Sequence, residues 1–240
     1  GAQVGVAQIA IQAIGFVSGI LVIRLLPTQE YALYTLANTM LGTMTVLADG
    51  GIATGVMSEG GKVWQDKRKL GAVLVTGMNL RKKFALFSLL VATPILLYIL
   101  HHHGASWLLS CLIALSLIPA FFASLSGRLL EIPSKLHQEV APLQKIQVAS
   151  NAGRLGLLTL TLFSFPFAGI AILSSGVAQV YANLRLRKVA GMHADPAVQP
   201  NQAVKKEISR IVKRRLPESI FYCISGQASV WILSAFGTTV

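Results

Sequence analysis

The chain has 240 residues, of which 53% are hydrophobic and only 12% are charged, and its mean hydropathy is +0.62. A soluble domain usually carries about 25% charged residues, so this composition excludes an ordinary water-soluble fold. The net charge of +12 invites comparison with nucleic-acid-binding proteins, but the basic residues flank apolar segments and no DNA-reading motif accompanies them. We therefore expect an all-α membrane protein without a nucleic-acid partner.

Apolar stretches long enough to cross a bilayer recur along the chain, since a membrane-spanning helix needs roughly 20 mainly apolar residues. Seven candidate spans are predicted, at residues 4–26, 31–57, 84–100, 106–126, 146–165, 166–184 and from 219 to the end. The first span lacks the basic start of a cleaved signal peptide. Because the last span continues to Val240, we expect the sequence to be part of a longer protein.

Lys and Arg residues gather in the loops after the second, fourth and sixth spans, whereas loops 101–104 and 165–166 contain neither. Basic loops tend to stay in the cytoplasm, so this alternation predicts a cytoplasmic N-terminus. Residues 67–83 carry apolar side chains at Leu70, Val73, Leu74 and Met78 between two basic ends, which predicts an amphipathic helix on the inner membrane surface, with Trp64 at its start. Residues 190–202 are typical of a linker, and a second basic amphipathic helix is expected at 203–216, before Pro217.

Two short motifs resemble those of a known family. Residues 24–34, RLLPTQEYALY, resemble the R-L-L-x-x-x-E-Y-G-x-Y signature of Wzx-type polysaccharide flippases, which belong to the multidrug/oligosaccharidyl-lipid/polysaccharide (MOP) exporter superfamily. Residues 47–52, LADGGI, resemble the D-x-G element of the same family. The sequence departs from the family pattern at Ala32 and Gly50. The signature residues in this chain are Arg24, Glu30, Tyr31, Asp49 and Gly51.

The resemblance implies a two-lobe, MATE-like transporter. On that basis residues 1–189 would be the N-terminal six-helix lobe, 190–216 a cytoplasmic linker with a basic amphipathic helix, and 217–240 the first helix of a truncated second lobe. The family function is flipping of undecaprenyl-diphosphate-linked oligosaccharide across the bacterial inner membrane by alternating access, for O-antigen, capsule or exopolysaccharide assembly. The implied partners are the lipid-linked oligosaccharide, membrane lipids, the polysaccharide polymerase and chain-length machinery, and a coupling proton or sodium ion.

Arg154 lies near the middle of the fifth predicted span, where a cation costs about 2.5 to 3.5 kcal/mol. A guanidinium group matches phosphate oxygens in two-pronged hydrogen bonds, so Arg154 is a candidate for binding the diphosphate of the substrate. A buried ion pair with Asp49 is the alternative. Asn38, Gln12 and Asn151 are candidates for binding the sugar beside Arg154, although hydrogen bonding between helices explains such residues equally well.

Asp49 is the acidic residue that lies well inside an apolar segment. It is a candidate for binding a coupling ion or for neutralising an arginine, but a structural role beside Gly50 and Gly51 is favoured. The pairs Gly15/Gly19 and Gly51/Gly55 have the G-x-x-x-G spacing of closely packed helices. An ion pair between Arg24 and Glu30 would join the ends of the first two spans.

Other chemistry is less well supported by the sequence. The run His101–His103 has no companion cluster, and Cys111 and Cys223 fall inside apolar segments, so we assign no metal and no cofactor. A drug/cation antiporter of the same superfamily would need more intramembrane acids. A membrane polysaccharide polymerase would need a large loop with clustered catalytic groups. We therefore expect a transporter, not an enzyme.

Overall fold

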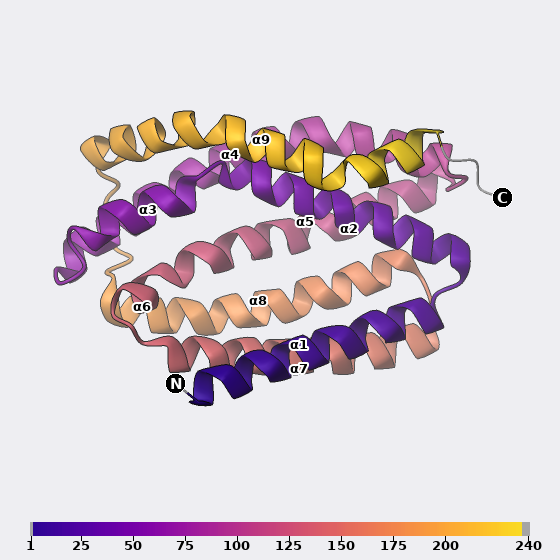
Figure 1. Cartoon of the computed structure of the whole chain (residues 1–240), viewed down its shortest axis with the longest axis horizontal. Helices are drawn as coiled ribbons and strands as arrows, with labels where there is room; N and C mark the ends of the chain where they lie inside the picture. Colours follow the sequence, from indigo (N-terminus) through magenta and orange to yellow (C-terminus); the bar gives the residue numbers. More distant parts are fainter. Residues whose placement is uncertain (1, 237–240) are drawn as a thin grey trace.

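The computed structural model describes the backbone of residues 2–236 and the side chains of residues 5–223, 225 and 226. Within that range the chain is built from helices and contains no strand. The helices run side by side along the long axis of the molecule (Figure 1). Their bounds are α1 Ala2–Leu25, α2 Thr28–Asp49, α3 Ile52–Gly61, α4 Lys67–His102, α5 Trp107–Leu130, α6 Ile132–Leu136, α7 Val140–Ser164, α8 Ala168–His193 and α9 Gln202–Phe236.

The connections between helices divide into two groups at opposite ends of the bundle. The α3–α4 turn, α6 and the α8–α9 linker lie at one end, together with the start of α1 (Figure 1). We call it the basic end, because Lys62, Lys67 and Lys135 lie in or beside these connections. The connections α1–α2, α4–α5 and α7–α8 lie at the other end and carry no Lys or Arg. The helices therefore place the basic loops together, as the alternation of charge along the sequence predicts.

The core forms where α8 packs between α5 and α7, with α1 against α7 and α2 against α4. Small residues allow close approach of α5 and α8: a Cβ on Gly176 would lie 3.3 Å from the Cβ of Ala120. Many large apolar side chains remain exposed on the outside of the bundle, among them Phe16, Phe87 and Phe163. So much exposed apolar surface is unfavourable in water and is compatible with a lipid environment.

In the described part of the chain, three helices are long and apolar enough to cross a membrane, namely α1, α4 and the α5–α6 segment. The count is four if α2 and α3 together form one bent span. The seven spans expected from the sequence are thus not confirmed as a set. Although α7 and α8 have the required length, their hydropathy is lowered by polar residues such as Asn151, Arg154 and Gln179, which line one pocket.

The predicted second span is broken in its last third. Gly50 has φ 46° and Gly51 has φ 92°, a left-handed conformation that glycine adopts without the penalty of a Cβ atom. The chain bends by 43° between α2 and α3 at this point. A Cβ on Gly51 would lie 2.6 Å from the Cβ of Arg215, so α9 packs directly against the break.

The predicted surface helix at 67–83 is not a separate element. It forms the first half of α4, which continues without a break to His102. Leu70, Val73 and Leu74 are buried in a cluster with α3 and α9, and the backbone of Asp195 in the α8–α9 linker lies against Gly71. The expectation of a helix lying on the membrane surface is therefore wrong for this segment, because its apolar face is covered by protein.

The end of the chain also differs from the expected boundaries. Helix α8 extends to His193, which leaves residues 194–201 as the linker, and α9 continues through Pro217 as one helix. The Gly51/Gly55 pair packs against α9, as its spacing predicts, with Ile208 3.0 Å from a Cβ on Gly55. By contrast, a Cβ on Gly15 or Gly19 would meet no atom within 4 Å, so close packing at that pair is not observed.

Candidate functional site

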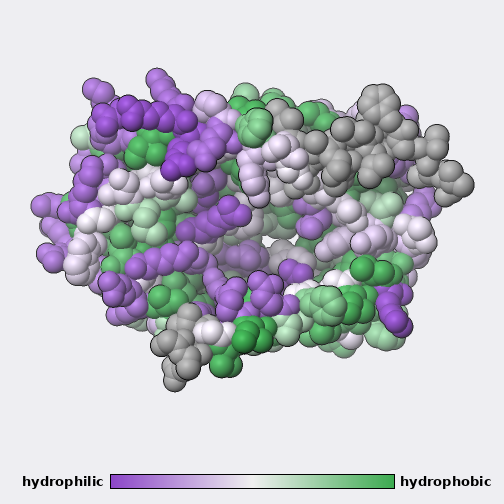
Figure 2. Space-filling model, viewed as in Figure 1, coloured by the Kyte–Doolittle hydropathy of each residue, from purple (hydrophilic) through white to green (hydrophobic). Residues whose placement is uncertain are grey.

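A polar pocket of about 200 Å³ opens between α2, α5, α7 and α8. We call it the Arg154 pocket. Hydrophilic residues extend from the basic end into the middle of the face shown in Figure 2, where the surface is hollowed. The residues that line the Arg154 pocket are Tyr34, Asn38, Leu41, Ala120, Ser124, Ser150, Asn151, Arg154, Ser175, Gly176, Ala178 and Gln179.

Arg154 is half-buried on α7 and forms no hydrogen bond or ion pair with any described residue. Its Nε atom is buried and lacks a hydrogen-bond partner. The great majority of buried donors in proteins have a hydrogen-bond partner. The Nε of Arg81 is also unpaired, so the distinguishing feature of Arg154 is that no part of its guanidinium is paired with a described residue, which leaves it available to an anionic or polar ligand.

The hydroxyl groups around Arg154 are mostly engaged within the helices. Ser150 Oγ donates to the carbonyl oxygen of Ala178 at 2.8 Å, which joins α7 to α8. Ser175 Oγ donates to Ala171 at 3.1 Å, and Ser124 Oγ donates to Phe121 at 2.8 Å. These hydroxyls therefore have no proton to spare. Among the residues that line the pocket, Arg154 is the one cation available to an anion.

Two of the predicted sugar-binding residues lie beside Arg154, and one does not. Asn38 on α2 is exposed and lines the pocket, and Asn151 lines it one helical turn before Arg154. The Asn151 amide donates to the carbonyl oxygen of Gln147 at 2.8 Å, which fixes its orientation. Gln12 is exposed on α1 and lies outside the pocket, which no residue of α1 lines.

The sequence analysis did not single out Tyr34, Ser124 or Gln179, which also line the pocket. Tyr34 precedes Asn38 by four residues, so helical spacing alone would have placed both on one face of α2. Ser124 and Gln179 offered no comparable signal, because their place beside Arg154 depends on how α5 and α8 pack.

The predicted alternative of an Arg154–Asp49 ion pair is wrong. Asp49 instead pairs with Arg81 of α4, whose side chain is 3% exposed. The second arm of Arg81 donates to the carbonyl oxygen of Leu125 on α5 at 2.7 Å. Asp49 also accepts a hydrogen bond of 3.3 Å from the backbone of Ala53 at the start of α3. Asp49 therefore neutralises an arginine, which was the less favoured alternative, and its hydrogen bond to Ala53 spans the break at Gly50 and Gly51.

The predicted ion pair between Arg24 and Glu30 is also absent. Glu30 Oε2 accepts a hydrogen bond of 2.8 Å from the backbone N–H of Ala168, the first residue of α8. A carboxylate is stabilised at a helix N-terminus by the unpaired N–H groups and the helix dipole, which explains this choice of partner. Arg24 is exposed, and Tyr31 packs into the cluster formed by α1, α7 and α8.

The histidine run at the end of α4 is held by local contacts. His101 Nδ1 lies 3.0 Å from the carbonyl oxygen of Ala105, and its ring stacks on Trp107 at 4.4 Å between centroids. His103 Nδ1 lies 2.9 Å from the carbonyl oxygen of Ile99. Among the described residues, no group of three His, Cys, Asp or Glu side chains is arranged to hold a metal ion.

Both cysteines are free thiols. The sequence predicts that both are buried; Cys223 is buried, whereas Cys111 is exposed.

Comparisons with known proteins add no relative: no family model, no curated protein and no solved structure matches this chain. Its function must therefore be inferred from its sequence motifs and from the geometry of the Arg154 pocket.

Proposed function

We propose that this chain is part of a transporter that flips an oligosaccharide linked to undecaprenyl diphosphate across the bacterial inner membrane. The product would be used to assemble O-antigen, capsule or exopolysaccharide. The observation that carries the proposal is the unpaired guanidinium of Arg154 in a polar pocket inside an otherwise apolar helix bundle. Arg154 would bind the diphosphate, and Asn38 and Asn151 would bind the sugar.

The chemistry of the pocket suits such a substrate. A diphosphate offers several anionic oxygens, which a guanidinium binds in two-pronged hydrogen bonds. The low dielectric of a helix bundle strengthens this attraction relative to water. A site near the middle of a membrane protein, between repeated bundles, is typical of transporters that work by alternating access.

In this proposal helices α1 to α8 belong to one lobe, the second half of α9 begins the other lobe, and the basic end faces the cytoplasm. The lysines and arginines there would contact anionic lipid headgroups, each contributing about 1 kcal/mol near the surface. A second lobe would close the other side of the Arg154 pocket. Transport would then need both lobes, with proton or sodium coupling as a separate question for the whole protein.

The two alternative functions have less support from the described residues. A cation antiporter needs an intramembrane carboxylate that is free to bind an ion, whereas Asp49 is held by Arg81. A polymerase needs a nucleophile or a general acid and base. The described residues that line the Arg154 pocket include no His, Cys, Asp or Glu.

The experiment that tests this proposal is complementation of a strain that lacks its polysaccharide flippase, using the full-length gene. Surface polysaccharide is scored for wild type, Arg154→Ala, Arg154→Lys and the control Arg187→Ala, with membrane expression measured for each. Arg187 is an exposed residue of α8 outside the pocket. We expect loss of polysaccharide in Arg154→Ala, partial function in Arg154→Lys and full function in the control.

Normal polysaccharide in a well-expressed Arg154→Ala strain would refute a substrate role for Arg154. If wild type itself fails with several glycan types, the flippase proposal loses its basis. Transport of a fluorescent lipid-linked oligosaccharide by reconstituted full-length protein would then decide between flipping and the other functions.

A further inference from the structure

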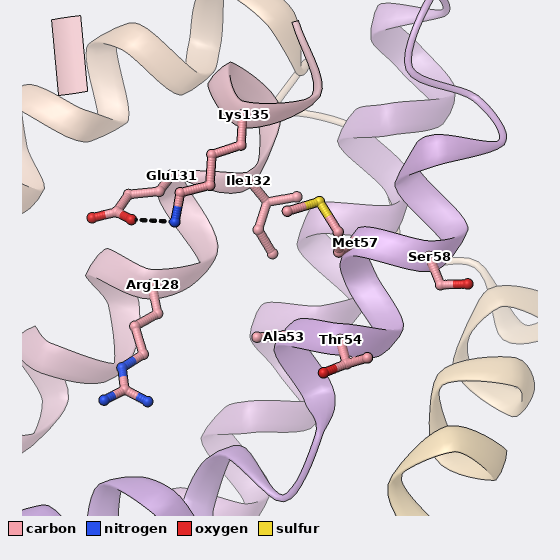
Figure 3. A pocket seen from close by; sticks show the side chains of 8 residues that line it. All are labelled: Ala53, Thr54, Met57, Ser58, Arg128, Glu131, Ile132 and Lys135. Atoms are coloured by element: carbon pink, nitrogen blue, oxygen red, sulfur yellow. Dashed lines mark ion pairs between the residues drawn. The ribbon is translucent and has the colours of Figure 1, made fainter. Parts of the chain in front are cut away.

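A second pocket, of about 680 Å³, opens at the basic end between α3, α5 and α6. We call it the Arg128 pocket. Its volume lies within the usual range of roughly 300 to 1,000 Å³ for small-molecule sites. Figure 3 shows Arg128, Glu131 and Lys135 on one side of the pocket and Thr54 of α3 on the other. Its lining residues are Ala53, Thr54, Met57, Ser58, Arg128, Glu131, Ile132 and Lys135.

The charges around this pocket leave Arg128 without a counterion. Glu131 accepts a hydrogen bond from Lys135 Nζ at 2.7 Å and another from Gln147 Nε2 at 3.0 Å, so its charge is already compensated. The charge of Arg128 also interacts with that of Arg81, which Asp49 neutralises. Arg128 is exposed and makes no hydrogen bond or ion pair with any described residue.

Residues of α5 line both pockets, and α7 lines the Arg154 pocket and contacts Glu131 of the Arg128 pocket. On α5, Ser124 lines the Arg154 pocket, and Arg128 follows it by four residues, a rise of about 6 Å along one helix face. On α7, Gln147 contacts Glu131 of the Arg128 pocket and precedes Arg154 by seven residues, a rise of about 10 Å. An anion that leaves Arg128 would therefore need to move only a short distance to reach Arg154.

We propose that the Arg128 pocket is a second anion site, which binds a phosphate or diphosphate group at the basic end before that group reaches Arg154. This inference rests on the proposed transport function. Arg128 supplies the charge and the two-pronged donor, and the exposed hydroxyl of Thr54, on the opposite side of the pocket, supplies a neutral donor (Figure 3). Lys135 also lines the pocket, but its charge is paired with that of Glu131.

The first test is titration of purified full-length protein, in nanodiscs of phosphatidylcholine, with inorganic pyrophosphate at fixed ionic strength. Loss of a charge-assisted hydrogen bond from Arg128→Gln should weaken binding at least about tenfold. The matched control is Arg187→Gln, which removes an exposed arginine of the basic end outside the pocket and should change binding less than about twofold. Equal loss in both variants would refute a specific site and leave only diffuse attraction.

A second variant predicts a change of the opposite sign. Glu131→Gln retains an oxygen that can accept from Gln147 but releases Lys135, so pyrophosphate should bind several-fold more tightly. A damaged protein cannot produce such a gain. Unchanged or weaker binding in a folded Glu131→Gln protein would contradict the proposed arrangement of charges.

The source of the phosphate is resolved by a parallel measurement in nanodiscs that contain phosphatidic acid. Reduced enrichment of this lipid around Arg128→Gln, relative to Arg187→Gln, would assign the site to a lipid headgroup. An effect on pyrophosphate alone would assign it to a soluble phosphate. Both results support an anion site, and an effect in neither arm would refute it.

The outcome for this site can be separated from that for the transport function. Arg154→Gln should retain the part of pyrophosphate binding that depends on Arg128. If Arg128→Gln loses pyrophosphate binding while wild type fails to restore polysaccharide with several glycan types, the transport proposal fails and the anion site stands. If wild type restores polysaccharide while Arg128→Gln binds pyrophosphate normally, the anion site fails and the transport proposal stands.

Discussion

Arg81 and Arg154 both lie within long helices of the same bundle, but their surroundings are opposite. Arg81 is almost fully buried, and Asp49 and the carbonyl oxygen of Leu125 accept its hydrogen bonds. Arg154 is half-buried beside an open pocket, and no described residue forms a hydrogen bond or ion pair with its guanidinium. The Nε atoms of both arginines lack a partner, so the difference between them lies in the Nη groups. The first arginine joins three helices, whereas the second is the one that we propose binds a ligand. A charged residue inside an apolar helix is therefore a candidate for function only if no charged residue of the protein is paired with it.

The largest expected effect tests the Arg81 side of this comparison. Asp49→Asn would leave the Arg81 guanidinium buried without a counterion, which should reduce the free energy of unfolding by about 3 to 5 kcal/mol. Thermal or denaturant unfolding of the purified protein in detergent measures this change. The double variant Asp49→Leu/Arg81→Met removes both charges and should recover most of the loss; no recovery would contradict the ion-pair explanation.

A second prediction concerns the break that brings Asp49 to Arg81. Gly51→Ala places a Cβ atom at φ 92° and 2.6 Å from the Cβ of Arg215, so it should destabilise the protein by about 1 to 3 kcal/mol. Gly15→Ala is the matched control, since its Cβ meets open space inside α1, where alanine favours the helix by up to about 1 kcal/mol. A similar melting temperature for the two variants would mean that the break is not needed.

The Arg154 side of the comparison predicts almost no change in stability. Arg154→Met removes a cation that has no protein partner, so the free energy of unfolding should stay within about 0.5 kcal/mol or increase. The same variant should lose transport in the complementation assay. A loss of stability as large as that of Asp49→Asn would show that Arg154 has a structural partner and would remove the contrast.

The smallest expected effect concerns Asp66, a carboxylate that is more exposed than that of Asp49. Asp66 caps α4, and the hydrogen bond from the backbone N–H of Lys69, aided by that of Arg68, lowers the pKa of Asp66 below its usual 3.8. Its stabilising effect is therefore present above pH 3.8 and is lost as the pH falls through the lowered pKa. Asp66→Asn keeps a capping oxygen that does not titrate.

The measurement is the melting temperature of wild type and Asp66→Asn as a function of pH. The two curves should keep a constant separation above pH 3.8 and then change relative to each other as wild type loses its cap below that pH. Parallel curves through the acid range would mean that Asp66 does not contribute through its charge.

The helical, apolar character of the chain and the candidacy of Arg154 follow from the sequence, because long apolar runs and a cation inside one are local features. The partner of Asp49 could not be predicted in the same way. Arg81 lies 32 residues away in a basic run, where its charge looks like part of a surface segment. Only the packing of α4 against α5 turns it inward.

Long-range packing also explains the other differences from the predicted structure. The periodicity of residues 67–83 correctly predicts an apolar face, but periodicity does not say whether lipid or protein covers it, and here α9 and the linker do. Gln12 has the residue type of a sugar-binding group, yet no residue of α1 lines the pocket. Residue type and spacing thus predict which face is polar or apolar, whereas the neighbour depends on contacts between distant segments.

The hydrogen bond from Ala168 to Glu30 has a consequence for biogenesis. Its two residues are separated by 138 positions, so Glu30 is synthesised long before the helix start that it caps. At roughly 5 to 20 residues per second, the ribosome needs on the order of ten seconds to supply that partner. During this interval the carboxylate of the first helical hairpin stays solvated at the end of the bundle. The hydrogen bond that connects the start of α8 to the start of α2 can therefore form only after α1 to α7 have been synthesised.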